Sequence, residues 1–423
     1  MPSLIRSTSK ILSHAANTSD TTFGMVIETT ADNELFTIGC HAGFTDANVD
    51  WGDGSTSAIT TYNDADLTHT YASASEHTIV ISGTTSLNMY GAANSSRLKV
   101  KRVLNFGNTG ATQLSGAFRG CENMTSFVSG NCDTSSVYNM SRMFQGCTSL
   151  TTLDVSGFDT SSVTDMYAMI HNCISITSLD VSNWDTSSVR NMSYVISRCS
   201  NLTSLDVSNW DTSNVTNMGY VISRCYNLTS IDVSNWDTSS VTNMNSMFRE
   251  NTVLTTCDVS GFDTSSVTAM NGMFQDCNDV TSLDVSGFNT SLVTNMYAMF
   301  YRCRAATAGL DVSSFDTSSV TNMQYMFQEL GTDNGASIDI IGVENFNIEA
   351  FIFTNSLRNF MTGVAIPTAR YDSLLINWDA QDPLDGLSPT FGSSQYTAGG
   401  TAAAARANLI STDGWTITDG GTA

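Results

Sequence analysis

The 423-residue chain is poor in charged residues, and poorest in basic ones: 13% are charged, with 17 Lys and Arg against 40 Asp and Glu. The formal net charge of −23 repels phosphate, so we expect no nucleic-acid partner and no docking on anionic lipid. No apolar run reaches about 18 residues, which predicts no membrane insertion. Residues 1–20 lack a continuous apolar stretch, so we expect no secretory signal there.

Motifs that carry catalysis are also scarce. The five histidines stand in no H-x-x-x-H or H-E-x-x-H arrangement. No G-x-S-x-G, P-loop or G-x-G-x-x-G signature occurs where its structural context would support it. We therefore predict that the chain is not an enzyme and needs no cofactor.

What the chain does have is a 26-residue repeat. Residues 202–227 read LTSLDVSNWDTSNVTNMGYVISRCYN, and a near copy begins at Leu228. Identical residues that recur at one position of successive repeats are expected to stack on one another in the core. We call such a stack a ladder and expect the ladders to be buried, with their cysteines reduced. The predicted structural ladder consists of Cys147, Cys173, Cys199, Cys225, Met192, Met218, Met244, Trp184, Trp210 and Trp236.

The apolar spacing changes within each repeat. An L-x-x-L-x-V rhythm over 202–207 predicts a short strand. Apolar residues then recur at i, i+3, i+6, i+7 and i+10 over 215–225, which favours one face of a helix. The predicted fold class is an α/β solenoid of leucine-rich-type 26-residue strand–turn–helix repeats, preceded by a small β-sandwich.

The repeat string LTSLDVSNWDTSSVTNM, followed by M-F and Cys, resembles the BspA-type, or Mycoplasma lipoprotein-type, leucine-rich repeat. The resemblance covers roughly residues 104–360. It implies a curved solenoid used in adhesion and surface recognition rather than in catalysis.

Both flanks of the repeats carry resemblances of their own. VDWGDGST at Val49–Thr56 and HTY at His69–Tyr71 resemble elements of a polycystic-kidney-disease (PKD) type domain. The C-terminal stretch, which includes YDSLLINWDAQDP and SPTFGSSQYTAGGTAAAARANLISTDGWTITDGG, is similar to segments at the ends of phage tail and virion proteins and of some secreted bacterial repeat proteins. Within it we predict short helices at Tyr371–Trp378 and Ala402–Leu409.

These features predict four domains. They are an N-terminal attachment segment at 1–21, a PKD-like β-sandwich at 22–103, the repeat solenoid at 104–360, and a C-terminal cap at 361–423. A small independent domain is the alternative for the last of them.

One Asp beside the predicted strand recurs in each repeat, as at Asp206 and Asp232, which we take as candidate binding residues. We call each of these repeated carboxylates a rung. The rungs of neighbouring repeats would repel each other unless Ser, Thr or turn N–H groups donate hydrogen bonds to them. Calcium between the rungs is the alternative, since hard cations take oxygen ligands. Glycoside cleavage would need carboxylates in unequal environments, whereas identical rungs predict identical ones.

The other candidates for binding are exposed positions whose residue differs from repeat to repeat while the core positions stay the same. Several of these positions hold Tyr or Arg, which are frequent in binding hot spots. Ordinary solvated surface, or contact between repeats, is the alternative. The candidates are Tyr194, Tyr220, Tyr297, Tyr325, Arg198, Arg224 and Arg302.

The predicted function is that of a non-enzymatic phage virion protein, a tail fibre or receptor-binding protein, that recognises the host cell surface through its repeats. A structural virion or appendage protein, or a bacterial surface adhesin, is the alternative. The expected partners are a host receptor, protein or glycan, and other virion proteins, with self-association left open. The expected location is the virion, and the outside of the cell after host lysis.

Overall fold

In a computed structural model of the chain, residues 22–92, 95–334 and 337–423 are described. The attachment segment predicted at 1–21 lies outside them. The chain divides into two compact bodies. The first body runs up to Val189 and includes Tyr194–Asp206; the second comprises Arg190–Ser193 and Val207–Ala423.

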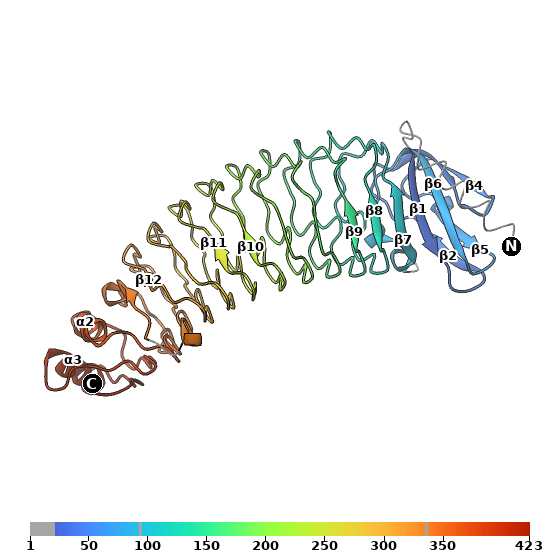
Figure 1. The fold of residues 1–423 in the computed structure, drawn as a ribbon. Coiled ribbons are helices and arrows are strands. Elements are labelled where there is room, and N and C mark those ends of the chain that lie inside the picture. The colour runs from blue at the N-terminus through green and yellow to red at the C-terminus, as the bar shows by residue number, and fades with distance from the viewer. Residues whose placement is uncertain (1–21, 93–94, 335–336) are drawn as a thin grey trace. The chain divides into compact units, whose positions relative to one another are not determined.

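A seven-stranded mixed sheet organises the first body, in the order β4-β3-β6-β1-β7-β8-β9 (Figure 1). β1 pairs antiparallel with β6 and β7, whereas β7, β8 and β9 pair in parallel. The strands are β1 (Phe23–Glu28), β3 (Thr45–Asp50), β4 (Thr56–Ile59), β6 (Glu76–Thr84), β7 (Val100–Asn105), β8 (Ser126–Val128) and β9 (Thr152–Asp154). The N-terminal strands and the first repeats therefore share one sheet.

A second, two-stranded sheet pairs β2 (Glu34–Thr37) antiparallel with β5 (Thr68–Tyr71). Three 3-10 turns complete this region: η1 (Ala65–Leu67), η2 (Met89–Gly91) and η3 (Ser96–Lys99). Phe36 of β2 and Tyr71 of β5 are fully buried, as is Trp51 after β3. This apolar core holds the N-terminal strands together.

The second body holds only short strands and two α-helices among its described residues. β10 (Ser230–Ile231) pairs in parallel with β11 (Thr256–Cys257), and β12 (Leu310–Asp311) with β13 (Ile340–Ile341). Two 3-10 turns, η4 (Thr332–Asn334) and η5 (Val343–Asn345), precede the helices α2 (Thr368–Asp379) and α3 (Thr401–Ser411). The helices expected at Tyr371–Trp378 and Ala402–Leu409 are thus confirmed.

The segment of each repeat with helix-like spacing forms tight turns instead. Arg142 and Gly146 have φ values of 57° and 78°, and the corresponding positions of the other repeats are also left-handed. A right-handed helix needs negative φ throughout. Apolar residues three apart serve the turns equally well, because Met143 N–H donates to Met140 O at 3.2 Å and Cys147 N–H to Phe144 O at 3.1 Å.

The remaining N–H groups of these turns bond to the following repeat. Phe144 N–H donates to Met169 O at 2.8 Å, and Gly146 N–H to His171 O at 2.9 Å. Local and inter-repeat bonds therefore alternate along the segment. A helix would have directed these N–H groups to its own carbonyls and would have left neighbouring repeats without this ladder.

The predicted α/β solenoid of strand–turn–helix repeats is therefore wrong. The described residues hold two α-helices, both after the repeats, and the main sheet is a seven-stranded mixed sheet rather than a regular strand in every repeat. A separate preceding β-sandwich is wrong as well, because β1 pairs with β7 and β7 with β8. The apolar spacing over 215–225 indicates which residues are buried, and a series of tight turns can bury residues at that spacing as well as a helix can.

Candidate functional site

The outer strand of the seven-stranded sheet, β9, lacks a bonded neighbour on one side. β8 pairs with it from Ser126↔Thr152 to Val128↔Asp154. On the other side, no backbone hydrogen bond joins residues 151–156 to residues 177–182, all of which are described. We call this place, between 151–156 and 177–182, the open junction. It is an exposed strand edge inside a series of repeats.

Other junctions are closed at the matching threonine. Thr203 N–H donates to Thr177 O at 3.2 Å, and Thr255 N–H donates to Thr229 O at 3.0 Å. At the second of these, β10 and β11 also pair. We call this place, between 229–234 and 255–260, the closed junction. The open junction is thus a local departure from the pattern of its neighbours.

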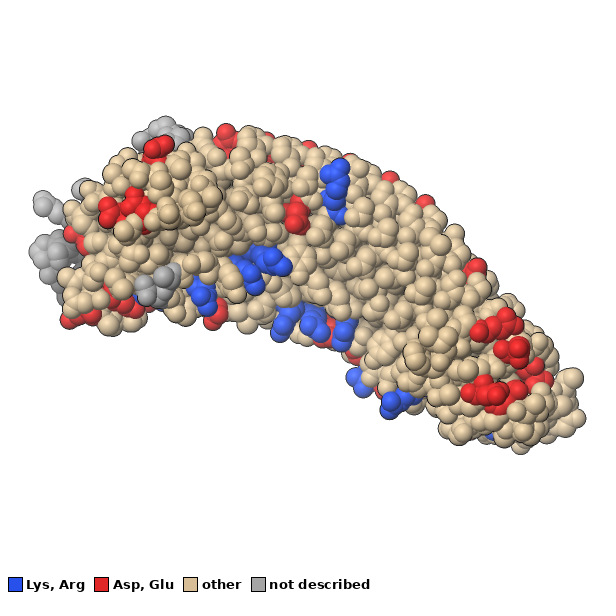
Figure 2. Space-filling view, turned by 180° about the vertical axis from the view of Figure 1, so that it is seen from behind, with Lys and Arg blue, Asp and Glu red and all other residues tan. Residues whose placement is uncertain are grey.

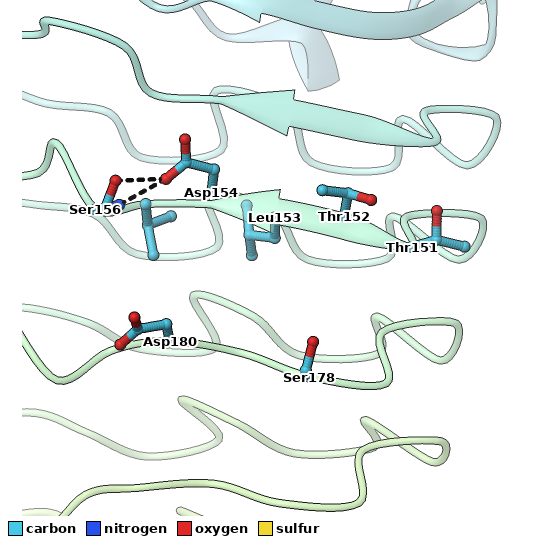
Figure 3. A pocket seen from close by; sticks show the side chains of 8 residues that line it. Thr151, Thr152, Leu153, Asp154, Ser156, Ser178 and Asp180 are labelled. Atoms are coloured by element: carbon cyan, nitrogen blue, oxygen red, sulfur yellow. Dashed lines mark hydrogen bonds between the residues drawn. The ribbon is translucent and has the colours of Figure 1, made fainter.

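A pocket of about 400 Å³ occupies the open junction (Figure 3). This volume falls in the range of small-ligand sites. Thr151, Thr152, Asp154 and Ser156 lie on one side, and Ser178 and Asp180 on the other. Leu153 and Val155 complete the lining, but both side chains are buried in the core. The groups that a ligand would meet are therefore hydroxyls, carboxylates and backbone.

Each pocket carboxylate is held by the serine two residues further on. Ser156 donates to Asp154 Oδ1 from Oγ at 2.6 Å and from N–H at 3.0 Å, as the dashed lines of Figure 3 show. Ser182 donates to Asp180 Oδ1 in the same way, and these bonds lower the pKa of the Asp180 carboxyl. Each Oδ1 is thereby fixed and each Oδ2 points away from the serine, so the pocket holds two preorganised acceptors.

The predicted residues Asp206 and Asp232 are both exposed rungs of the same series. Ser234 donates to Asp232 Oδ1 from Oγ at 2.7 Å and lowers the pKa of that carboxyl. Neither residue lines the pocket at the open junction. No group of three or more His, Cys, Asp or Glu among the described residues is placed to hold a metal ion.

The predicted tyrosines lie in the left-handed turns. Tyr194, Tyr220 and Tyr325 have φ values between 57° and 61°. Tyr297, which is exposed, packs edge-on against Tyr325 with ring centroids 5.5 Å apart. In the first body Tyr194 packs edge-on against Tyr167 at 5.9 Å. Much of the tyrosine surface is therefore used between repeats.

The predicted arginines also adopt left-handed backbone, and two of them form ion pairs between repeats. Arg224 donates to Glu250 Oε1 at 3.1 Å. Arg302 lies 3.6 Å from Asp276 and 3.4 Å from Glu329. Arg198 is exposed. The structure brings Arg302, Tyr297 and Tyr325 into one cluster, with Tyr301 between Arg302 and Tyr325.

The repeated cysteines act as hydrogen-bond donors between repeats. Cys173 Sγ–H donates to Phe144 O at 3.1 Å, and Cys199 Sγ–H to Ile170 O at 3.1 Å. Asn251 fills the one slot without cysteine and does the same, with Nδ2 2.7 Å from Ile222 O. Burial raises the pKa of the Cys277 thiol to about 12, so such thiols stay protonated and unreactive.

The rest of the predicted structural ladder lies in the core. Met192, Met218 and Met244 are fully buried, and Trp184, Trp210 and Trp236 are 3% exposed. In the second body the rings of Trp210 and Trp236 stack with centroids 6.1 Å apart. Cys147 donates from Sγ–H to Phe118 O at 3.2 Å, and the Cys225 N–H donates to Asn251 Oδ1 at 2.9 Å.

Charge is sparse over the face shown in Figure 2, where acidic side chains gather at the C-terminal end. Burial, together with the carboxylates of Asp379, Asp385 and Asp382, raises the pKa of Asp413. No described helix is both long enough and apolar enough to cross a membrane.

The hydroxyl residues of the pocket, Thr151, Thr152 and Ser178, were missed by sequence reasoning. Threonine or serine stands at the same positions in neighbouring repeats, as at Thr203, Ser204 and Ser230. Nothing in the residue types therefore marks the open junction, because what differs there is the backbone pairing.

A family model described as Mycoplasma protein of unknown function, DUF285, matches residues 112–231 and 224–339, which together span more than half of the chain. The family is associated with BspA-like Mycoplasma surface repeat proteins, so the BspA-type resemblance is confirmed at that level. No curated protein and no solved structure matches the chain.

Proposed function

The chain belongs to the family described as Mycoplasma protein of unknown function, DUF285, and from this we propose that it is a non-enzymatic protein that recognises a cell surface. The observation that carries the proposal is the polar pocket of about 400 Å³ at the open junction. A strand edge with free hydrogen-bonding groups, set on a frame of packed repeats, suits binding through many directional contacts.

Binding is favoured over catalysis because the pocket carboxylates have like surroundings. Asp154 and Asp180 each accept from the hydroxyl and N–H of their own serine. An acid–base pair needs two groups in unlike environments. The thiols of the repeat ladder are buried and protonated, so they offer no nucleophile either.

The setting that we propose is a phage virion, in which the chain is a tail fibre or receptor-binding protein. The support is the similarity of the C-terminal stretch within residues 361–423 to segments of phage tail and virion proteins, which it shares with some secreted bacterial repeat proteins, together with the association of the family with surface repeat proteins. The partners would be a host receptor and other virion proteins. A structural virion or appendage protein, or a bacterial surface adhesin, is the second candidate.

We further propose that the N-terminal strands are related to PKD-type domains and act as a spacer. The motif residues that carry this resemblance lie together. Trp51 stacks on His69 with centroids 4.9 Å apart, His69 Nε2 lies 2.7 Å from Asp53 Oδ2, and Tyr71 Oη–H donates to Trp51 O at 2.9 Å. This arrangement fixes the loop after β3 against β5.

The test is binding of the purified full-length chain, fluorescently labelled, to a panel of intact bacterial cells that includes mycoplasmas. We expect saturable binding to some of them, competed by unlabelled protein. Heat-unfolded chain is the control for non-specific adhesion. The absence of saturable binding across the panel, with immunogold labelling of the chain only at an ordered position inside a particle, would favour the structural alternative.

A further inference from the structure

The open junction presents a mixed set of hydrogen-bonding groups to solvent. Thr151 and Thr152 are exposed on one side and Ser178 on the other. The hydroxyls of Thr152 and Ser178 can both donate and accept, whereas that of Thr151 donates to Thr125 O at 3.1 Å and is left as an acceptor. The backbone edge of β9 adds further hydrogen-bonding groups, since no backbone bond joins residues 151–156 to residues 177–182. Asp154 and Asp180 add acceptors only.

We infer that this pocket binds a sugar residue that is neutral or carries an amine, through its hydroxyl or amino groups. The inference rests on the proposed recognition function and names the ligand class for that same site. A sugar hydroxyl donates to a carboxylate and accepts from a serine hydroxyl or a backbone N–H, so each of its groups finds a partner here.

Acidic ligands are excluded by charge. The pocket contains two carboxylates, and no Lys or Arg lines it. A phosphate, sulfate or sugar carboxylate would meet two like charges with no compensating cation. An amine, in contrast, would gain a charge-assisted hydrogen bond to Asp154 or Asp180.

Apolar ligands are excluded because the pocket exposes almost no apolar surface. Leu153 and Val155 are the two apolar residues of the lining, and they are 8% and 1% exposed. A lipid tail or apolar peptide side chain would therefore bury little apolar area while it stripped water from hydroxyls and carboxylates.

The site depends on Asp154 and Asp180, which gives a matched control elsewhere in the chain. Asp→Asn keeps an Oδ1 acceptor for the serine and replaces the free acceptor with an amide donor. Asp258 is the same rung at the closed junction, held by Ser260 Oγ at 2.7 Å. The variant Asp154→Asn/Asp180→Asn therefore removes the ligand acceptors, and Asp258→Asn repeats the chemistry outside the pocket.

The test is a glycan array with the full-length chain, comparing neutral oligosaccharides, glucosamine oligomers, and sialylated, uronic or sulfated ones. We expect binding to members of the first two groups, reduced about tenfold or more by Asp154→Asn/Asp180→Asn and unchanged by Asp258→Asn. Circular dichroism and thermal midpoints check that the variants fold.

Three results would overturn the inference: selective binding of acidic glycans, equal loss of binding in Asp258→Asn, or no glycan binding by a chain that still binds cells. In the last case the recognition function stands and its ligand is of another class. If wild-type chain binds neither glycans nor cells, the proposed function itself fails. Ser178→Trp, which fills the pocket with an exposed residue, gives an independent check and should abolish glycan binding.

Discussion

The open and closed junctions carry almost the same sequence and differ in how their backbones meet. The open one joins TTLDVS at 151–156 to TSLDVS at 177–182, and the closed one joins TSIDVS at 229–234 to TTCDVS at 255–260. At the closed junction Thr255 N–H bonds to Thr229 O, and β10 pairs with β11. At the open junction such bonds are missing and a pocket is present. Residues of the same type at the same repeat position therefore have different surroundings at the two junctions.

The two junctions show that a polar pocket can arise in a repeat without any special residue. The open junction stays together through contacts away from the strands. Thr160 Oγ1–H donates to Asp185 O at 2.9 Å, and Asn172 N–H donates to Ser197 O at 2.8 Å. These bonds lie outside residues 151–156 and 177–182, so they leave the edge of β9 uncovered.

The largest expected effect comes from filling the pocket. Ser178→Trp places a bulky ring at the open junction, whereas Thr256→Trp places the same ring on an exposed residue of β11 at the closed junction. We expect Ser178→Trp to abolish binding to cells and Thr256→Trp to leave it within about twofold. Equal effects of the two substitutions on the dissociation constant would show that the pocket is not the binding site.

A second effect concerns stability. Cys199 Sγ–H bonds to Ile170 O at the open junction and Cys277 Sγ–H to Phe248 O at the closed one, both at 3.1 Å. Replacing either buried thiol by alanine should cost about 1–2 kcal/mol of unfolding free energy, from a lost bond and a small cavity. Urea titration measures the cost.

We expect Cys199→Ala to be the more harmful of the two, because no strand pairing supports the open junction. A larger loss of unfolding free energy in Cys277→Ala would mean that strand pairing contributes little to holding the repeats together. The two junctions would then not differ in stability in the way that their backbone pairing suggests.

A third effect tests the turns. Arg198 has φ 59° and is exposed, whereas Gly146 adopts φ 78° at the same position of another repeat. Left-handed backbone costs an ordinary residue about 1 kcal/mol, so Arg198→Gly should raise the unfolding free energy by up to about 1 kcal/mol. A clear loss of stability in thermal unfolding would show that the Arg198 side chain makes contacts worth more than that backbone strain.

The smallest effect is on pH dependence. Hydrogen bonds from Ser182 and Ser234 lower the pKa values of Asp180 and Asp232 in the folded chain. Their contribution to stability is complete above the ordinary carboxyl pKa of about 3.9, and it is lost as pH falls through the lowered folded values. Ser182→Ala should raise the pKa of Asp180 and leave that of Asp232 unchanged. Carboxyl NMR titration measures both pKa values, and an unchanged pKa of Asp180 in Ser182→Ala would contradict the role of the serine.

The repeat and the helices α2 and α3 could be predicted from residue spacing, and the family from the resemblance of the repeat string. The helix in each repeat could not be excluded, because Val, Met and Cys at three-residue intervals are buried equally by helices and by successive tight turns. Glycine at 116, 120, 146 and 272, on left-handed positions, was the available signal against it. The open junction left no such signal, since its side chains repeat at closed ones.

Amide hydrogen exchange of the free chain reports directly on the backbone difference between the two junctions, on which the proposed site depends. We predict that Thr177 N–H, which has no backbone partner across the open junction, exchanges about tenfold or more faster than Thr255 N–H, which bonds to Thr229 O at 3.0 Å. We further predict that a bound sugar ligand slows exchange at 177–180 and leaves exchange at 255–257 unchanged. Equal protection of Thr177 and Thr255 in the free chain would contradict the open junction.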